Sequence, residues 1–211
     1  MPELTLLEWY AKDHTYLDLM DQCEALVKYI ADRLGIGGKL HYQGETIALD
    51  RSWQRVTVSE AFRLHSDISV SEALNLSRFD EIISFQIEPH LGTTTPAFLY
   101  DYPACLASLA KLLPKNPDYA QRVEFYVAGI ELANGFTELT DAAEQKQRFH
   151  KENIIRVSQG KSLLPVPDSF LKDLDTMPGA AGMALGVDRL VMLFCNAKDI
   201  DEVILFTPET L

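Results

Sequence analysis

Strand-like segments follow one another in this chain with few helices between them, and this order constrains the fold strongly. Residues 97–102 and 122–128 are rich in apolar and aromatic side chains, and a further strand is expected to start near Ile130. Parallel neighbours need a long crossover, usually a helix, whereas antiparallel neighbours need only a short turn. The order therefore predicts an α+β domain in which helices flank an antiparallel sheet.

Helices are predicted where apolar residues recur every three or four positions, and where capping residues precede them. The predicted helices cover residues 15–34, 141–159, 168–174 and 187–194. Residues 35–92 are interpreted as an insertion that holds a hairpin and short helices, with Ser69 or Ser71 capping one helix and Ser77 another. We expect a single domain over residues 1–211.

Two predictions concern the C-terminal part of the chain. Gly179, Gly182 and Gly186 are expected to open a loop before the helix at 187–194. Residues 202–206 are expected to form a last short strand.

The composition excludes several classes of function. The 211 residues carry 19 Lys and Arg against 31 Asp and Glu, for a net charge of -12, which repels a phosphate backbone and disfavours broad nucleic-acid binding. The three cysteines form no CxxC pair, so neither a disulfide framework nor a zinc ribbon is indicated, and a cytoplasmic location is expected. We find no apolar run of about 18 residues and no signal peptide, so no membrane association is expected.

The first candidate site segment is Leu7-Glu8-Trp9-Tyr10. On a strand, Glu8 and Tyr10 point to the same face, where a carboxylate beside an aromatic ring suits a cation. The alternative is an ordinary strand with an exposed Glu and a core Tyr.

The second segment spans residues 129–141, where Glu131 and Glu138 flank Asn134-Gly135. A strand that bends at the glycine can bring both carboxylates into one cleft. Their oxygens would suit Mg²⁺ with nucleotide phosphates, or a substrate ammonium with Phe136 beside it. The alternative is a tight Asn-Gly hairpin with two solvated acids.

The third segment spans residues 182–190, where small residues alternate before a helix begins. An arginine in the first turn of that helix, Arg189, can face a phosphate. The alternative is that Gly182 and Gly186 serve only close packing and that Asp188 and Arg189 are surface charges.

Together these segments resemble a known family. GMALGVDRLVML resembles motif 3 of the class II aminoacyl-tRNA synthetases, PELTLLEWY resembles the second strand of motif 2 in their lysyl branch, and GIELANGFTELTDAAEQKQRF resembles a lysyl synthetase segment. The details, including PAFLYDYPACLASLAK, are most similar to the elongation factor P–lysine lysyltransferases, which are lysyl-tRNA synthetase paralogues without an anticodon domain. The resemblance covers essentially the whole chain.

The resemblance implies a reaction and its participants. Lysine or (R)-β-lysine would be activated by ATP, with Mg²⁺, to an adenylate, and the acyl group would pass to a lysine of elongation factor P rather than to tRNA. By position, Arg189 would contact the γ-phosphate, Gly186 would lie against the nucleotide with Leu132 nearby, and Glu131 would bind Mg²⁺–ATP.

The resemblance also implies an amino-acid pocket. Glu8, Tyr10 and Glu138 would hold the ammonium groups, while Asn134 and Phe136 would shape the pocket. Ala184 stands where the tRNA-charging relatives usually have glycine, which fits a β-amino acid better than an α-amino acid.

One departure leaves the activity open. In the family, motif 1 and the motif 2 arginine that binds the α-phosphate precede the point where this sequence begins, so we expect an N-terminally truncated catalytic domain. The alternatives are therefore a non-catalytic remnant that binds ATP or an amino acid, and a lysyl-tRNA synthetase fragment. An exposed sheet edge would also favour a homo-oligomer.

Overall fold

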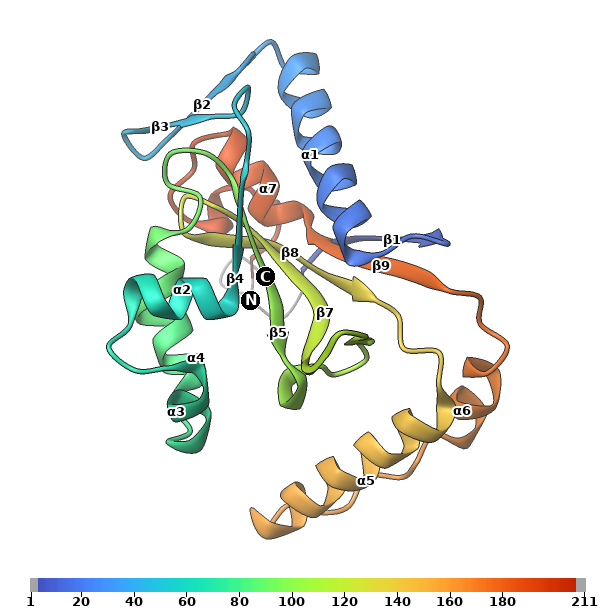
Figure 1. The fold of residues 1–211 in the computed structure, drawn as a ribbon. Helices are drawn as coiled ribbons and strands as arrows, with labels where there is room; N and C mark the ends of the chain where they lie inside the picture. Colours follow the sequence, from blue (N-terminus) through green and yellow to red (C-terminus); the bar gives the residue numbers. More distant parts are fainter. Residues whose placement is uncertain (1–3, 208–211) are drawn as a thin grey trace.

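The fold is that of a computed structural model, which describes residues 4–207. A twisted sheet of seven strands forms its centre, and helices lie on both of its faces (Figure 1). The strands are β1 (Leu6–Lys12), β2 (Lys39–Tyr42), β3 (Glu45–Ala48), β4 (Gln54–Thr57), β5 (Ala97–Pro103), β6 (Leu112–Leu113), β7 (Asn116–Val127), β8 (Ile130–Thr137) and β9 (Ala180–Gly186). Of these, β2 and β3 form a separate hairpin.

The helices follow the predicted positions closely. They are α1 (Tyr16–Arg33), α2 (Val58–His65), α3 (Val70–Asn75), α4 (Phe79–Ile82), α5 (Ala142–Ser158), α6 (Asp168–Leu174) and α7 (Val187–Phe194), with short 3₁₀ or π turns η1 (Ile83–Ile87), η2 (Glu88–His90), η3 (Ala104–Leu106) and η4 (Ile200–Glu202). The predicted cap of α5 is confirmed, because the Asp141 carboxylate accepts a hydrogen bond from the Glu144 amide at 2.9 Å.

The sheet order is β1-β9-β8-β7-β5-β4, with β6 beside β7. The predicted antiparallel sheet is confirmed for every pair in it except β4 and β5, which run parallel. The exception has a plain cause: α2, α3, α4, η1 and η2 carry the chain across between the two strands, which is the long connection that a parallel pair requires.

Two hydrophobic cores lie on opposite faces of the sheet. On one face, Met20 and Cys23 of α1 pack with Phe125 and Leu185, and the β2–β3 hairpin and α7 complete this core. On the other face, the α2–η1 segment packs over β5, with Phe62 and Leu99 among its buried residues. This second cluster covers only the β5 side, which leaves the part of that face formed by β1, β9, β8 and β7 for polar side chains.

The glycine-rich segment is a central strand and not the predicted loop. β9 lies between β1 and β8, and Gly182 is needed there because a Cβ atom at this position would lie only 2.6 Å from the Tyr10 ring and 2.7 Å from a Glu138 oxygen. Side chains from the neighbouring strand and loop therefore occupy the space above the glycine.

Four smaller expectations were wrong. The chain turns at Ala128 and Gly129, both with positive φ, whereas Asn134-Gly135 lies within β8, so no Asn-Gly hairpin forms. Arg78 and not Ser77 precedes α4. The strand expected over residues 122–128 begins earlier, at Asn116, and ends at Val127. No strand forms at 202–206, where Glu202 is instead the last residue of η4, a short turn capped at its start by Asp199.

Trp53 joins the sheet to α1 and the hairpin, and it provides a test of the first core. Its ring is 6% exposed and stacks on Phe125 with centroids 5.2 Å apart, while its Nε1–H donates to the Leu49 carbonyl. We predict that Trp53→Ala lowers the free energy of unfolding by about 3–5 kcal/mol, because it leaves a large cavity. Urea unfolding followed by circular dichroism measures this, with Trp53→Phe as the milder control; a loss below about 1 kcal/mol for the alanine variant would contradict the packing described.

Candidate functional site

The three candidate segments meet on one face of the sheet. The register places Glu8 opposite Ala184, Ala184 opposite Asn134, and Asn134 opposite Glu124. The next row along the sheet runs through Tyr10, Gly182, Phe136 and Arg122. Residues between these rows, such as Met183 and Val123, point into the opposite core. Strand alternation therefore separates a polar site from an apolar core within the same four strands.

At one end of this site, Glu8, Tyr10 and Glu138 form an acidic cluster around Gly182. The Tyr10 ring and the Glu138 carboxylate approach each other above this glycine, and Glu8 lies two residues from Tyr10 on the same face. Burial raises the pKa of Glu138 to about 7, and no hydrogen bond to its carboxylate is found among the described residues. Burial and the charges of Glu138 and Glu8 raise the pKa of Tyr10 as well. A cationic ligand would relieve both effects.

The raised pKa of Glu138 makes a prediction for stability. Because the carboxyl holds its proton in the folded chain up to about pH 7 but loses it near pH 4.5 when unfolded, its contribution to stability is present below pH 4.5 and is lost as the pH rises through 7. We predict that Glu138→Gln removes this loss, so the variant gains stability relative to the parent between pH 4.5 and 7 and keeps that gain above pH 7. Urea unfolding of both proteins at pH 5, 6, 7 and 8 measures the difference; a difference independent of pH would contradict the assignment.

At the other end of the site, Arg189 lies beside Glu131. Its Nη1 donates to the Glu131 carbonyl oxygen at 2.6 Å and lies 3.6 Å from the Glu131 carboxylate. Arg189 belongs to the first turn of α7, and half of its side chain is exposed, so the guanidinium is accessible to an anion. Gly186 ends β9 immediately before the helix, with the Leu132 carbonyl 3.6 Å from where a Cβ would stand. The Leu132 side chain itself lies in the core, so only its backbone faces the site.

Glu131 and Glu138 do not share one cleft, contrary to the expectation from a bend at glycine. They lie at opposite ends of β8, about 20 Å apart along an extended strand. A bulge between Glu131 and Ala133, opposite Phe125 and Tyr126, brings Glu131 to the same face as Asn134. The two carboxylates therefore serve separate parts of the site.

Between the two ends lies a buried polar network that the sequence analysis missed. Glu124 is 7% exposed, and its carboxylate accepts hydrogen bonds from the Tyr102 hydroxyl, from the Tyr126 hydroxyl at 2.7 Å, from Arg122 Nη2 at 2.7 Å and from Asn134 Nδ2 at 2.9 Å. Burial and the Glu124 charge raise the pKa of both tyrosines. A signal is present in the sequence: Arg122 and Glu124 are opposite charges two residues apart in the segment 122–128, which is otherwise apolar and aromatic.

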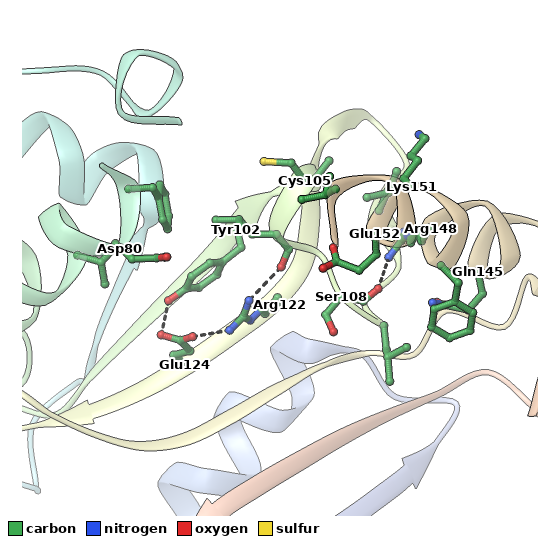
Figure 2. A pocket seen from close by; sticks show the side chains of 18 of the residues that line it. Asp80, Tyr102, Cys105, Ser108, Arg122, Glu124, Gln145, Arg148, Lys151 and Glu152 are labelled. Carbon is green, nitrogen blue, oxygen red and sulfur yellow. Dashed lines mark hydrogen bonds and ion pairs between the residues drawn. The ribbon is translucent and has the colours of Figure 1, made fainter. Parts of the chain in front are cut away.

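A cavity of about 1010 Å³ opens beside this network (Figure 2). Tyr102, Arg122 and Glu124 form its floor, α4 and η1 form one wall, and α5 forms the opposite wall. Arg148 fixes α5 in place by donating to the Ser108 and Ala110 carbonyls, both at 2.8 Å. Glu131 lines this cavity too, which connects the cavity to the Arg189 end of the site.

The donor set at Glu131 fits a magnesium–nucleotide complex. Burial together with the neighbouring charges of Glu124 and Glu88 raises the pKa of Glu131, even though Arg189 opposes this effect. A cation bound there would be favoured by the same charges. Within residues 4–207 no group of three or more acidic, histidine or cysteine side chains is placed to hold a metal ion, so Mg²⁺ would depend on phosphate oxygens and water for its remaining ligands.

Comparison with known proteins identifies the family. The model for "tRNA synthetases class II (D, K and N)" matches residues 1–210. The chain belongs to this family. The predicted fold class, a class II synthetase-like domain, is therefore confirmed.

Individual curated relatives show a more specific similarity than the family model does. A protein of Pectobacterium carotovorum subsp. carotovorum (strain PC1) is 38% identical over 99% of this chain and 66% of its own length. Proteins of Enterobacter sp. (strain 638) and Vibrio cholerae serotype O1 are 36% and 38% identical over 98% and 97% of this chain, each over 65% of its own length. All three are named elongation factor P–(R)-β-lysine ligase, so the predicted resemblance is confirmed; the chain spans slightly less than two thirds of their length.

Proposed function

We propose that this domain activates lysine or (R)-β-lysine with ATP, as an adenylate, and transfers the acyl group to a lysine of elongation factor P. The observation that carries the proposal is that the acidic cluster of Glu8, Tyr10 and Glu138 lies on the same face of one sheet as the Arg189–Glu131 pair. One end suits ammonium groups and the other suits phosphates. The names of the relatives support the same substrates.

The acidic cluster would bind the amino acid through charge. Glu138 carries a raised pKa and has no cationic partner among the described residues, so a ligand ammonium would supply the missing charge. Phe136 lies in the row of Tyr10 and Gly182 and would provide an apolar wall for an alkyl chain. Asn134 is held by Arg122 and Glu124, so its amide is oriented before any ligand arrives.

Ala184 would favour (R)-β-lysine. It lies between Glu8 and Asn134 on the polar face, and its methyl group fills space that a glycine would leave open. A ligand whose amino group stands one carbon further from the carboxylate would fit the reshaped pocket better.

The Arg189 end would bind the nucleotide. ATP with Mg²⁺ supplies the activated phosphorus and the charge neutralisation when bound. Glu131 would hold the metal, Arg189 would hold a phosphate, and the α7 N-terminus next to Gly186 would add its partial positive charge. Positioning and electrostatics, rather than a side-chain acid or base, would then carry catalysis.

In the transfer step, the amine of the acceptor lysine forms an amide bond to the acyl carbon. The bond from that carbon to the phosphate oxygen breaks as AMP leaves; one proton of the original ammonium stays on the amide nitrogen and the other two pass to solvent. The open cavity beside Glu131 would let the acceptor lysine enter and AMP leave.

A second candidate is a protein that binds ATP or an amino acid without turnover. It is favoured by the state of Arg122, whose guanidinium is already engaged by Glu124, Asn134 and the Leu106 carbonyl and is therefore not free for a second phosphate. A lysyl-tRNA synthetase fragment fits less well, because the chain is strongly acidic and carries Ala184.

Further proposals concern the setting of the protein. We infer a cytoplasmic protein that needs neither tRNA nor a membrane, and no helix of the described residues is long and apolar enough to span a bilayer.

We also infer a homo-oligomer. Within residues 4–207, β1 pairs on one side only, and Leu4, Leu6 and Leu7 are exposed along it. An apolar open edge favours pairing with a second copy.

ATP–pyrophosphate exchange tests the proposed activity. We predict exchange that depends on lysine or (R)-β-lysine, stronger with the β-amino acid, and a loss of about 10²–10³-fold in Arg189→Ala because a cation facing phosphate is removed. Arg63→Ala, an exposed arginine on α2, serves as the control. Binding of ATP and Mg²⁺ by calorimetry without exchange, in folded protein, would overturn the activity in favour of the second candidate.

Gly182→Ala tests the position of the amino-acid pocket. The added Cβ would stand 2.6 Å from the Tyr10 ring, so the variant should raise the KM for the amino acid at least tenfold and leave the KM for ATP within about twofold. Gly186→Ala is the matched variant at the other end, where a Cβ would make only ordinary contacts of 3.6–3.8 Å. Equal effects of Gly182→Ala on both KM values would contradict the assignment of two separate ends.

A further inference from the structure

Positive charge gathers on the outer part of α5, in contrast to the rest of the chain. Residues 146–161 hold five of the 19 Lys and Arg residues but only one of the 31 Asp and Glu residues, Glu152. In Figure 1, α5 extends away from the sheet, and its C-terminal half forms the far end of an arm. The arm is therefore basic on an acidic molecule.

The same part of the arm exposes apolar side chains. Ile154 and Leu163 are 69% and 66% exposed, and Ile155, Val157 and Leu164 are also exposed. We call Lys151, Ile154, Ile155, Lys161 and Leu163 the distal arm surface. Apolar side chains rimmed by cations are typical of a surface that binds another protein rather than of a solvated helix.

The cavity that α5 walls has the opposite charge. Its lining contains six carboxylates, against the three cations of Arg122, Arg148 and Lys151. Two ion pairs lie within this lining, Arg122 with Glu124 and Arg148 with Glu144, so four carboxylates and Lys151 remain outside these pairs. The carboxylates are Asp80, Glu88, Glu124, Glu131, Glu144 and Glu152.

One acceptor in the cavity wall, the side-chain oxygen of Gln145, has no hydrogen-bond donor among the described residues. Gln145 is 2% exposed, and its Oε1 is the buried side-chain acceptor without a hydrogen-bond partner in the part of the chain that is described. It lines the cavity from α5 (Figure 2). A buried acceptor without a donor is costly, so a ligand that brings N–H groups would be favoured there.

We propose that this cavity receives the side chain of the acceptor lysine, and that the distal arm surface docks on an acidic region of the acceptor protein around that lysine. This inference rests on the proposed function and names the acceptor side of the same site. The excess of carboxylates and the Gln145 acceptor suit an ammonium group. Glu131 lines the cavity, and its carboxylate lies 3.6 Å from Arg189. An acceptor lysine that enters the cavity past α5 would therefore approach the nucleotide end of the site.

An RNA partner fits these charges less well. A basic arm alone would suit a phosphate backbone, but the carboxylates of the cavity would repel the phosphate at a nucleotide terminus. The net charge of -12 opposes RNA over the whole surface as well. A protein with an acidic surface around one lysine would complement both the basic arm and the acidic cavity.

Binding of purified elongation factor P to charge-reversal variants tests the docking surface. We expect Lys151→Glu/Lys161→Glu to weaken the Kd at least tenfold at 50 mM salt, measured by biolayer interferometry, with a smaller difference at 300 mM. Lys39→Glu/Lys198→Glu, which changes two exposed lysines elsewhere by the same total charge, should stay within twofold.

Three results would overturn the docking surface: no binding by the parent protein, equal weakening in both double variants, or loss of lysine-tRNA binding with unchanged binding of elongation factor P. ATP–pyrophosphate exchange without elongation factor P reports separately on the proposed activity. The inference can therefore fail while activation survives, and the reverse can also occur.

Disulfide trapping tests the path of the lysine. Cys105 lines the cavity and is exposed, whereas Cys195 is exposed beyond the end of α7. Elongation factor P with cysteine in place of its modified lysine, activated as the mixed disulfide with thionitrobenzoate, should crosslink to the parent protein and to Cys195→Ser but not to Cys105→Ser. Crosslinking through Cys195, or none at all, would contradict insertion into the cavity.

Discussion

The pairing register of β1, β9, β8 and β7 is the constraint on which the whole site depends. In this register Glu8, Ala184, Asn134 and Glu124 form one row across the sheet, and the residues between the rows form the core under α1. A slip of one residue in any of these strands would exchange the two faces and bury charged side chains in the apolar core. The large cost of burying unpaired charge therefore keeps the polar face and the core in place together.

The polar face divides into two ends with different electrostatics. At the middle, Glu124 is buried but satisfied by four donors, so it fixes Arg122 and Asn134 rigidly. At either side the carboxylates are less well compensated: Glu138 has a pKa near 7, and that of Glu131 is raised by its neighbours. A satisfied centre between two poorly compensated ends is suited to binding two charged ligands in a defined relation.

Much of this could be predicted from the sequence, for physical reasons that particular residues show. The apolar period of residues 15–34 and the Asp141 cap are local signals, and the helices α1 and α5 follow them. The segments around Glu8, Glu131 and Arg189 were found separately from charge and spacing, while their meeting on one face depends on strand pairing between distant residues. The glycines of residues 179–186 predict a loop by local rules. Gly182 lies in a strand because its missing side chain makes room for Tyr10 and Glu138, and this tertiary contact is not visible in the sequence. Gln145 and the cavity likewise depend on how α5 packs against the η3 region.

We propose above that Glu138 pairs with an ammonium group of the substrate. Calorimetry of (R)-β-lysine and lysine binding at pH 6.5, in buffers of different ionisation enthalpy, measures the protons released. With a pKa of about 7, Glu138 is about three quarters protonated at this pH, so ammonium binding should release up to about 0.7 proton per ligand, and Glu138→Gln should abolish the release. Binding with no dependence on the buffer, or unchanged proton release in the variant, would contradict the account.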